Sequence, residues 1–182
     1  MHNRTVSDDL DDFRDDVRYL GILEEALRHH GHLSDQSLRD FSSLGDRWTR
    51  FGPMWEDHQV CLRGDATPAT FRFTDGMWVG GIDLEHSHCG GHDLDVGRIA
   101  GEPQRALILI QRDRLVAEPS VGHFVWEYSC HFPDREVSFA HICARVPFRS
   151  ATTMPRVARN PWITSEYRMK LTEVARDALR SR

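Results

Sequence analysis

The stretch TFRFTDGMWVGGIDL, residues 70–84, decides the fold expected for this chain. Apolar and polar side chains alternate on both sides of Asp75-Gly76, and such a pair between two strand-like runs is typical of a tight β-hairpin turn. In the simplest register Phe73 lies opposite Trp78, on a face that carries the large apolar residues. We therefore expect that face to point into the protein.

Further runs with strand-like composition follow the hairpin: RALILIQRDRLVAE (105–118), GHFVWEYSCHF (122–132) and EVSFAHICARV (136–146). They predict a meander-like antiparallel sheet of five or six strands over residues 69–147, curved toward a barrel or a cone. Residues 1–52 show helical periodicity and predict two N-terminal helices, the first capped by Ser7. Residues 145–162, which contain three prolines, predict an irregular crossing, and residues 163–181 predict one C-terminal helix, capped near Thr164. The expected fold is a single α+β domain that spans residues 1–182.

Composition narrows the classes of protein that fit. The chain has 182 residues, of which 40% are hydrophobic and 28% are charged, as in an ordinary soluble globular protein. The acidic start of the chain, where a signal peptide would be apolar, predicts a cytoplasmic protein without a membrane contact. A net charge of −5 argues against a nucleic-acid partner. Four cysteines without framework spacing predict free thiols rather than disulfides.

Three histidines and a cysteine crowd into EHSHCGGHD, residues 85–93. If the strand that contains Trp78 continues, alternation places His86 and His88 on its inward face, about 7 Å apart and within reach of one ion. His92 and Cys89 follow within four residues, and the glycines between them permit a tight turn. We therefore predict a histidine-rich metal-binding site made of His86, His88, His92 and Cys89, which holds a divalent metal, iron or zinc.

Residues close to this cluster are candidates for catalysis. Asp93 and Glu127 could orient a ligand or act as a general base, and His123 could act as an acid–base group or as a further metal ligand. The segment GGIDLEHSH, residues 80–88, is similar to the opening of the first cupin motif. The spacing of Pro119, Gly122 and His123 departs from the second cupin motif, so no family is assigned.

Three functions agree with these features. The first is a metal-dependent enzyme with a small-molecule substrate bound in a pocket of the curved sheet, with hydrolytic, lyase or oxygen-dependent chemistry. The second is a metal-free isomerase, dehydratase or cyclase that uses histidine as the acid–base group in the same pocket. The third is a ligand- or protein-binding domain without catalysis. Each of them is compatible with a homo-oligomer.

Overall fold

The computed structural model describes residues 5–29, 34–76, 78–110 and 112–181. Its helices are α1 (Phe13–His29), α2 (Asp35–Trp48), α3 (Asp93–Leu109), α4 (Glu118–Ser129), α5 (Arg135–Ala158) and α6 (Ser165–Arg180). Four short 3-10 helices are η2 (Gly52–Trp55), η3 (Pro68–Thr70), η4 (Leu84–His86) and η5 (Arg114–Ala117). Strand β1 (Gln59–Leu62) pairs with β4 (His88–Gly91), and β2 (Phe71–Phe73) pairs with β3 (Val79–Gly81), both antiparallel.

The predicted sheet of five or six strands is wrong. The structure is 66% helix and 9% strand, and its strands form two separate two-stranded sheets instead of one curved, barrel- or cone-shaped sheet over residues 69–147. Of the three runs expected to be strands, the first forms the end of α3 and η5, the second forms α4, and the third forms the start of α5. The chain is thus a helical bundle with two small β-ribbons, and not an α+β sheet fold.

The error arose because short apolar runs rich in aromatic and β-branched residues fit both periods. The buried positions have helical spacing. On α4, Val121 and Val125 pack inward, and on α5 the inward residues are Phe139, Ile142 and Val146, three and four positions apart. These side chains form a small apolar cluster with Val96 of α3, Phe124 and Tyr128.

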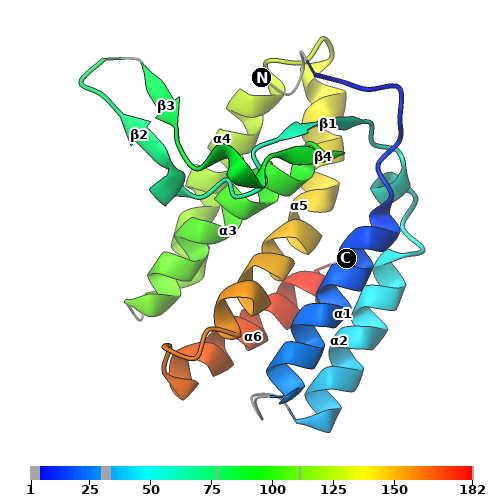
Figure 1. Cartoon of the computed structure of the whole chain (residues 1–182), viewed down its shortest axis with the longest axis vertical. Coiled ribbons are helices and arrows are strands. Elements are labelled where there is room, and N and C mark those ends of the chain that lie inside the picture. The colour runs from blue at the N-terminus through cyan, green and yellow to red at the C-terminus, as the bar shows by residue number, and fades with distance from the viewer. Residues whose placement is uncertain (1–4, 30–33, 77, 111, 182) are drawn as a thin grey trace.

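The prolines that follow in the sequence led to a second wrong prediction. The sequence predicted an irregular crossing over residues 145–162, but α5 runs through Pro147 and Pro155 without interruption. A proline in a helix interior costs about 3 kcal/mol. Burial on both sides of α5 offsets this cost, because α3 and α6 both pack along it (Figure 1).

The helices expected at the two ends of the chain are present. Ser34 caps α2 by accepting a hydrogen bond from the backbone N–H of Ser37, and Thr164 caps α6 by accepting one from Tyr167. The first helix begins at Phe13, later than the cap at Ser7 that the sequence suggested. None of the described helices is long and apolar enough to cross a lipid bilayer.

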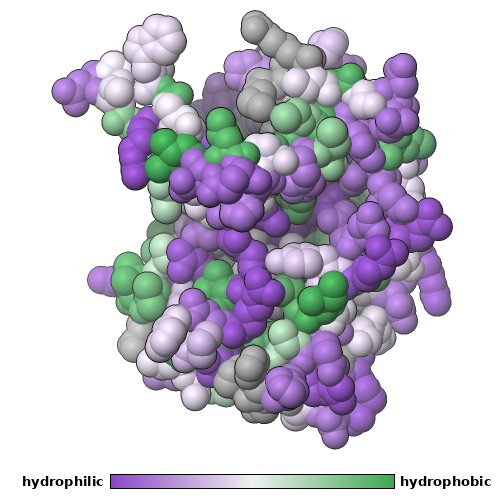
Figure 2. All heavy atoms as spheres, viewed as in Figure 1, coloured by the Kyte–Doolittle hydropathy of each residue, from purple (hydrophilic) through white to green (hydrophobic). Residues whose placement is uncertain are grey.

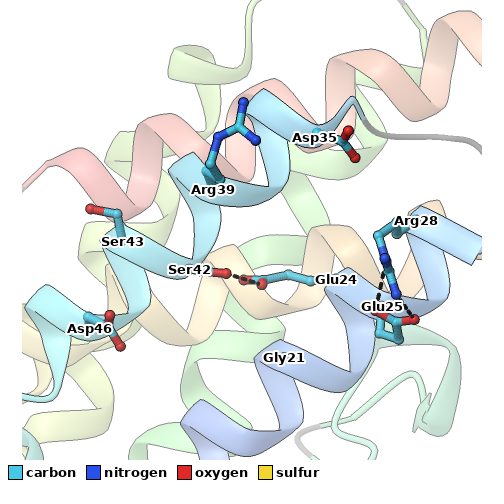
Figure 3. Close-up of a pocket in the computed structure, with 9 residues that line it drawn as sticks. All are labelled: Gly21, Glu24, Glu25, Arg28, Asp35, Arg39, Ser42, Ser43 and Asp46. Carbon is cyan, nitrogen blue, oxygen red and sulfur yellow. Dashed lines mark hydrogen bonds and ion pairs between the residues drawn. The ribbon is translucent and has the colours of Figure 1, made fainter.

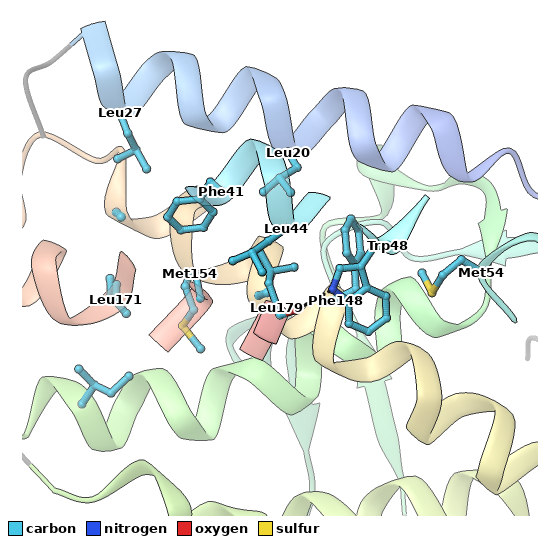
Figure 4. Packing of buried hydrophobic residues seen from close by; sticks show 14 of the residues in the cluster. Leu20, Leu27, Phe41, Leu44, Trp48, Met54, Phe148, Met154, Leu171 and Leu179 are labelled. Atoms are coloured by element: carbon cyan, nitrogen blue, oxygen red, sulfur yellow. Dashed lines mark hydrogen bonds between the residues drawn. The ribbon is translucent and has the colours of Figure 1, made fainter. Parts of the chain in front are cut away.

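The main apolar core lies where the α1–α2 pair packs against α5 and α6 (Figure 4). Leu20 and Leu27 of α1 and Phe41 of α2 are almost completely buried there. Trp48 fills the end of this core, and its indole N–H donates a 3.0 Å hydrogen bond to the carbonyl of Leu179. The two β-ribbons lie at the other end of α3 and α5, and the β2–β3 hairpin projects from the helical body (Figure 1).

Candidate functional site

The β2–β3 hairpin forms around Asp75-Gly76 as predicted, but its register differs. Phe73 pairs with Val79 instead of Trp78, and β3 ends at Gly81. Asp83 then adopts a left-handed conformation (φ 59°, ψ 59°), and the chain enters η4 instead of continuing as a strand. The alternation that was to turn His86 and His88 inward is therefore broken, and both side chains are exposed.

The predicted histidine-rich metal site is wrong. Among the described residues, no group of three or more His, Cys, Asp or Glu side chains is arranged to hold a metal ion. His86, His88 and Cys89 are exposed, whereas His92 is buried on the other side of β4. The iron or zinc cofactor stays a prediction and is not used below. His123 and Glu127 are exposed on α4, and their catalytic roles also stay predictions.

His92 and Asp93 belong to a buried cluster of charges. The His92 ring is 2.9 Å from the carboxylate of Asp57, and Arg145 contacts the same carboxylate at 2.9 Å. Asp93 is fully buried and accepts a 2.6 Å hydrogen bond from Nε of Arg149, which also pairs with Asp16. Arg149 overcomes the effect of burial and holds the pKa of Asp93 well below its usual range. These contacts tie the start of α3 to α5, to α1 and to the segment between η2 and β1, which is a structural role.

Asp11 joins this cluster from the segment before α1, 3.4 Å from Arg149. Burial, and then the nearby Asp16, raise the pKa of Asp11 to about 6. The acidic start of the chain thus turns inward to meet the arginines of α5. None of these residues lines the three cavities described below, and their carboxylates are engaged by arginine or histidine side chains, so the cluster joins elements of the fold.

The tight turn after β1 is held in place by side-chain hydrogen bonds from α3. The carboxylate of Asp95, in the first turn of α3, accepts hydrogen bonds from the backbone N–H groups of Arg63 (2.7 Å) and Gly64 (3.1 Å). Gly64 has a φ of +79°, and a Cβ there would lie 2.0 Å from the carbonyl oxygen of His86. Only glycine fits this position. We call residues 63–65 the anchored turn.

Asp65 follows Gly64 in the anchored turn and lines a cavity of about 580 Å³, the Asp65 cavity. Nη1 of Arg156 on α5 donates a 2.8 Å hydrogen bond to Oδ1 of Asp65. On α3, Arg105 donates through Nε and Nη2 to a single oxygen of Glu102. The remaining walls are Thr67, Pro68, Ala69, Pro103, Ala106 and Val157.

A third arginine lies beside the Asp65–Arg156 pair. Arg98 is half-buried on α3, and forms no ion pair with any residue that the structure describes. Burial, and then the neighbouring positive charge of Arg156, lower the pKa of Arg98 below its usual value. Nε of Arg156 is itself buried without a hydrogen-bond partner among the described residues. Two cations thus lie close together, and Asp65 and Asp95 are the nearby carboxylates that act on Arg98.

The sequence analysis missed Asp65, Arg98 and Arg156. A local signal existed, because Gly64-Asp65 directly follows the apolar strand β1 and predicts a turn that presents a carboxylate. The partner could not be found in this way, since Arg156 is 91 positions further along the chain.

A larger hollow, of about 750 Å³, lies between α1 and α2 (Figure 3). Glu24 of α1 points toward Ser42 of α2, whose hydroxyl donates a 3.0 Å hydrogen bond to it. Burial raises the pKa of Glu24 to about 7. Arg28 and Arg39 are bonded to neighbours on their own helices. Four carboxylates line the groove, those of Glu24, Glu25, Asp35 and Asp46, and both of its arginines are already bonded, so it is a weaker candidate than the Asp65 cavity.

Comparison with protein-family models, with curated proteins and with solved structures gave no match in any of the three. The chemistry of the site therefore rests on the chain's own residues.

Proposed function

We propose that the chain is a small-molecule enzyme in which Asp65 is the acid–base group. Its substrate carries an anionic group, a carboxylate or a phosphate, together with a hydroxyl group. Arg156 and Arg98 attract the anionic group, while Asp65 accepts the hydroxyl proton or returns it. The histidines expected to perform this chemistry have no part in the proposal.

One observation carries the proposal: Asp65 is presented to a cavity by a turn that the buried Asp95 fixes at two backbone positions. Catalytic groups commonly lie on loops that a rigid scaffold positions. Only one oxygen of Asp65, Oδ1, is engaged by Arg156 among the described residues. The other oxygen, Oδ2, is left for a ligand.

The charges around the cavity favour an anion. Glu102 is bound by Arg105, so its charge is already balanced. Asp65 pairs with Arg156, and Arg98, which does not itself line the cavity, adds a further positive charge close to that pair. A carboxylate or phosphate would reduce the repulsion between the two arginines, and guanidinium groups bind both kinds of anion well.

The four cysteines support a cytoplasmic location within this proposal. All four are free, and three of them are exposed, which suits a reducing compartment. The small-molecule substrate belongs to the proposal, whereas the absence of nucleic-acid and membrane partners and the possible homo-oligomer stay predictions.

The first experiment measures binding of two probes, malate and glycerol 3-phosphate, by isothermal titration calorimetry. We expect at least one of them to bind, and Arg156→Gln to weaken it by about tenfold or more, since a charge-assisted hydrogen bond is lost. Asp65→Asn should bind it at least as well as the wild type, because a negative neighbour is removed. Glycerol is the uncharged control.

Turnover separates binding from catalysis. Hydroxy acids and sugar phosphates are incubated with the protein and followed by proton and phosphorus NMR. For any compound that is converted, Asp65→Asn should lower the rate by about 10² to 10⁴, the usual contribution of a general acid–base group. Asp113→Asn, on the exposed segment before η5, is the matched control. A rate that Asp65→Asn leaves unchanged, or probes that bind equally to Arg156→Gln, would contradict the proposal.

A further inference from the structure

A second cavity is lined by residues of the same loop and of the β2–β3 hairpin, and this hairpin projects from the helical body (Figure 1). It has a volume of about 420 Å³, and we call it the hairpin cavity. Its walls come from the hairpin, the anchored turn, η4, α3 and α4: Arg63, Ala66, Phe71, Val79, Gly81, Leu84, Asp95, Ile99 and Tyr128. Most of these side chains are apolar, as is typical of sites for small organic ligands.

The first polar group of the hairpin cavity is the guanidinium of Arg63. It lies over the ring of Phe71, 4.8 Å from the ring centroid, and it donates to the hydroxyl and the carbonyl of Thr70 through Nε and Nη2. Nη1 has no hydrogen-bond partner among the described residues. A Cβ at position 81 would lie 2.0 Å from Nη1, so Gly81 keeps this donor in place.

Two further polar residues, Tyr128 and Asp95, line the cavity. Burial raises the pKa of Tyr128 well above its usual value, so the hydroxyl keeps its proton. Both carboxylate oxygens of Asp95 already accept backbone N–H groups of the anchored turn. The polar groups of the cavity are thus mainly donors.

Apolar surface continues out of the cavity along the hairpin. Phe73, Val79 and Leu84 are more than half exposed, and Figure 2 shows hydrophobic residues gathered at the base of the hairpin. Phe71 and Val79 line the cavity from the two paired strands of the hairpin. A flat ring that enters between the hairpin and α3 would contact this strand face on one side and Ile99 on the other.

We propose that the hairpin cavity binds a flat aromatic molecule that carries a hydrogen-bond acceptor, such as a carbonyl oxygen or a ring nitrogen. The ring packs against Phe71, Val79 and Ile99. The acceptor receives a hydrogen bond from Nη1 of Arg63. This site does not depend on the acid–base chemistry proposed for Asp65, because the two cavities share no lining residue.

The test uses prodan, a neutral naphthalene ketone whose emission shifts to the blue in an apolar site. We expect it to bind at one site in the wild type. Ile99→Trp places a larger side chain at the cavity wall, and should lower the affinity by about tenfold or more, because filling a cavity excludes its ligand. Ile110→Trp, the same change at an exposed position that ends α3, is the control and should leave the affinity unchanged.

A second variant tests the acceptor and remains informative if Ile99→Trp does not fold. Arg63→Met removes the guanidinium and keeps the apolar stem, and should weaken prodan by about threefold or more, because the hydrogen bond from Nη1 is lost. Binding of N-phenyl-1-naphthylamine, which lacks the ketone, should stay the same. The proposal is overturned if prodan does not bind, if both tryptophan variants bind it alike, or if Arg63→Met affects the two probes equally.

Discussion

The Asp65 cavity and the hairpin cavity differ in chemistry, although residues of the same loop, 63–70, line both of them. In the Asp65 cavity, Asp65 lies near arginines of α3 and α5, and each charged side chain that lines the cavity is part of an ion pair. In the hairpin cavity, Phe71, Val79 and Ile99 form an apolar space with a few hydrogen-bond donors. A single carboxylate, Asp95, fixes the turn from which both cavities are built. The contrast shows how one anchored loop can serve two different ligands.

The largest change to this comparison should come from Asp95→Ala. It leaves the backbone N–H groups of Arg63 and Gly64 without their acceptor, and each such buried group costs about 1–3 kcal/mol. We expect the free energy of unfolding to fall by about 2–4 kcal/mol in urea denaturation. Both malate or glycerol 3-phosphate and prodan should bind more weakly, because Asp95 no longer holds the turn that supplies Asp65 to one cavity and Arg63 to the other.

If Asp95→Ala weakened the binding of one kind of probe and left the binding of the other unchanged, this would contradict the claim that Asp95 supports both cavities. Asp93→Ala serves as a control for stability, because Asp93 lies two positions away on α3 and lines neither cavity.

Arg98→Met should have a smaller effect, which is limited to the Asp65 cavity. The change removes a half-buried cation that has no ion-pair partner among the described residues, while it keeps most of the apolar stem. We expect the protein to become more stable by about 1 kcal/mol or less, and anion binding in the Asp65 cavity to weaken. Prodan binding should not change. Thermal unfolding and the two titrations measure these effects. A loss of stability would contradict the prediction and show that Arg98 makes a stabilising contact in the folded protein.

Local signals in the sequence predicted the parts of the fold that local contacts determine. The cap at Thr164 and the apolar stripes of α1, α2 and α6 could be read directly, whereas the cap Ser34 was not recognised, and the Asp75-Gly76 hairpin formed where it was expected. The sheet was a mistaken interpretation of helices α4 and α5. Both helices are rich in aromatic and β-branched residues, which favour strands, and α5 contains prolines, which are unusual inside a helix.

The candidate site depends on contacts that no local pattern contains. His86 and His88 were misplaced by one left-handed residue, Asp83, because a change of backbone direction resets the alternation that the prediction followed. Asp65 and Arg156 meet only through the packing of α5 on α3. The histidines stand out in the sequence by their number, whereas the charged residues of the Asp65 cavity are ordinary in number and distinct only in position.

Hydrogen exchange at the backbone amides of Arg63 and Gly64 tests most directly whether Asp95 fixes the turn that both cavities share. In the wild type both amides should exchange slowly, and in Asp95→Asn they should exchange at least about tenfold faster, because an amide oxygen accepts a weaker hydrogen bond than a carboxylate. Amides in the middle of α6, around Leu171, should be unaffected. Equal protection of Arg63 and Gly64 in the two proteins would contradict the anchored turn, and with it the common origin of the two sites.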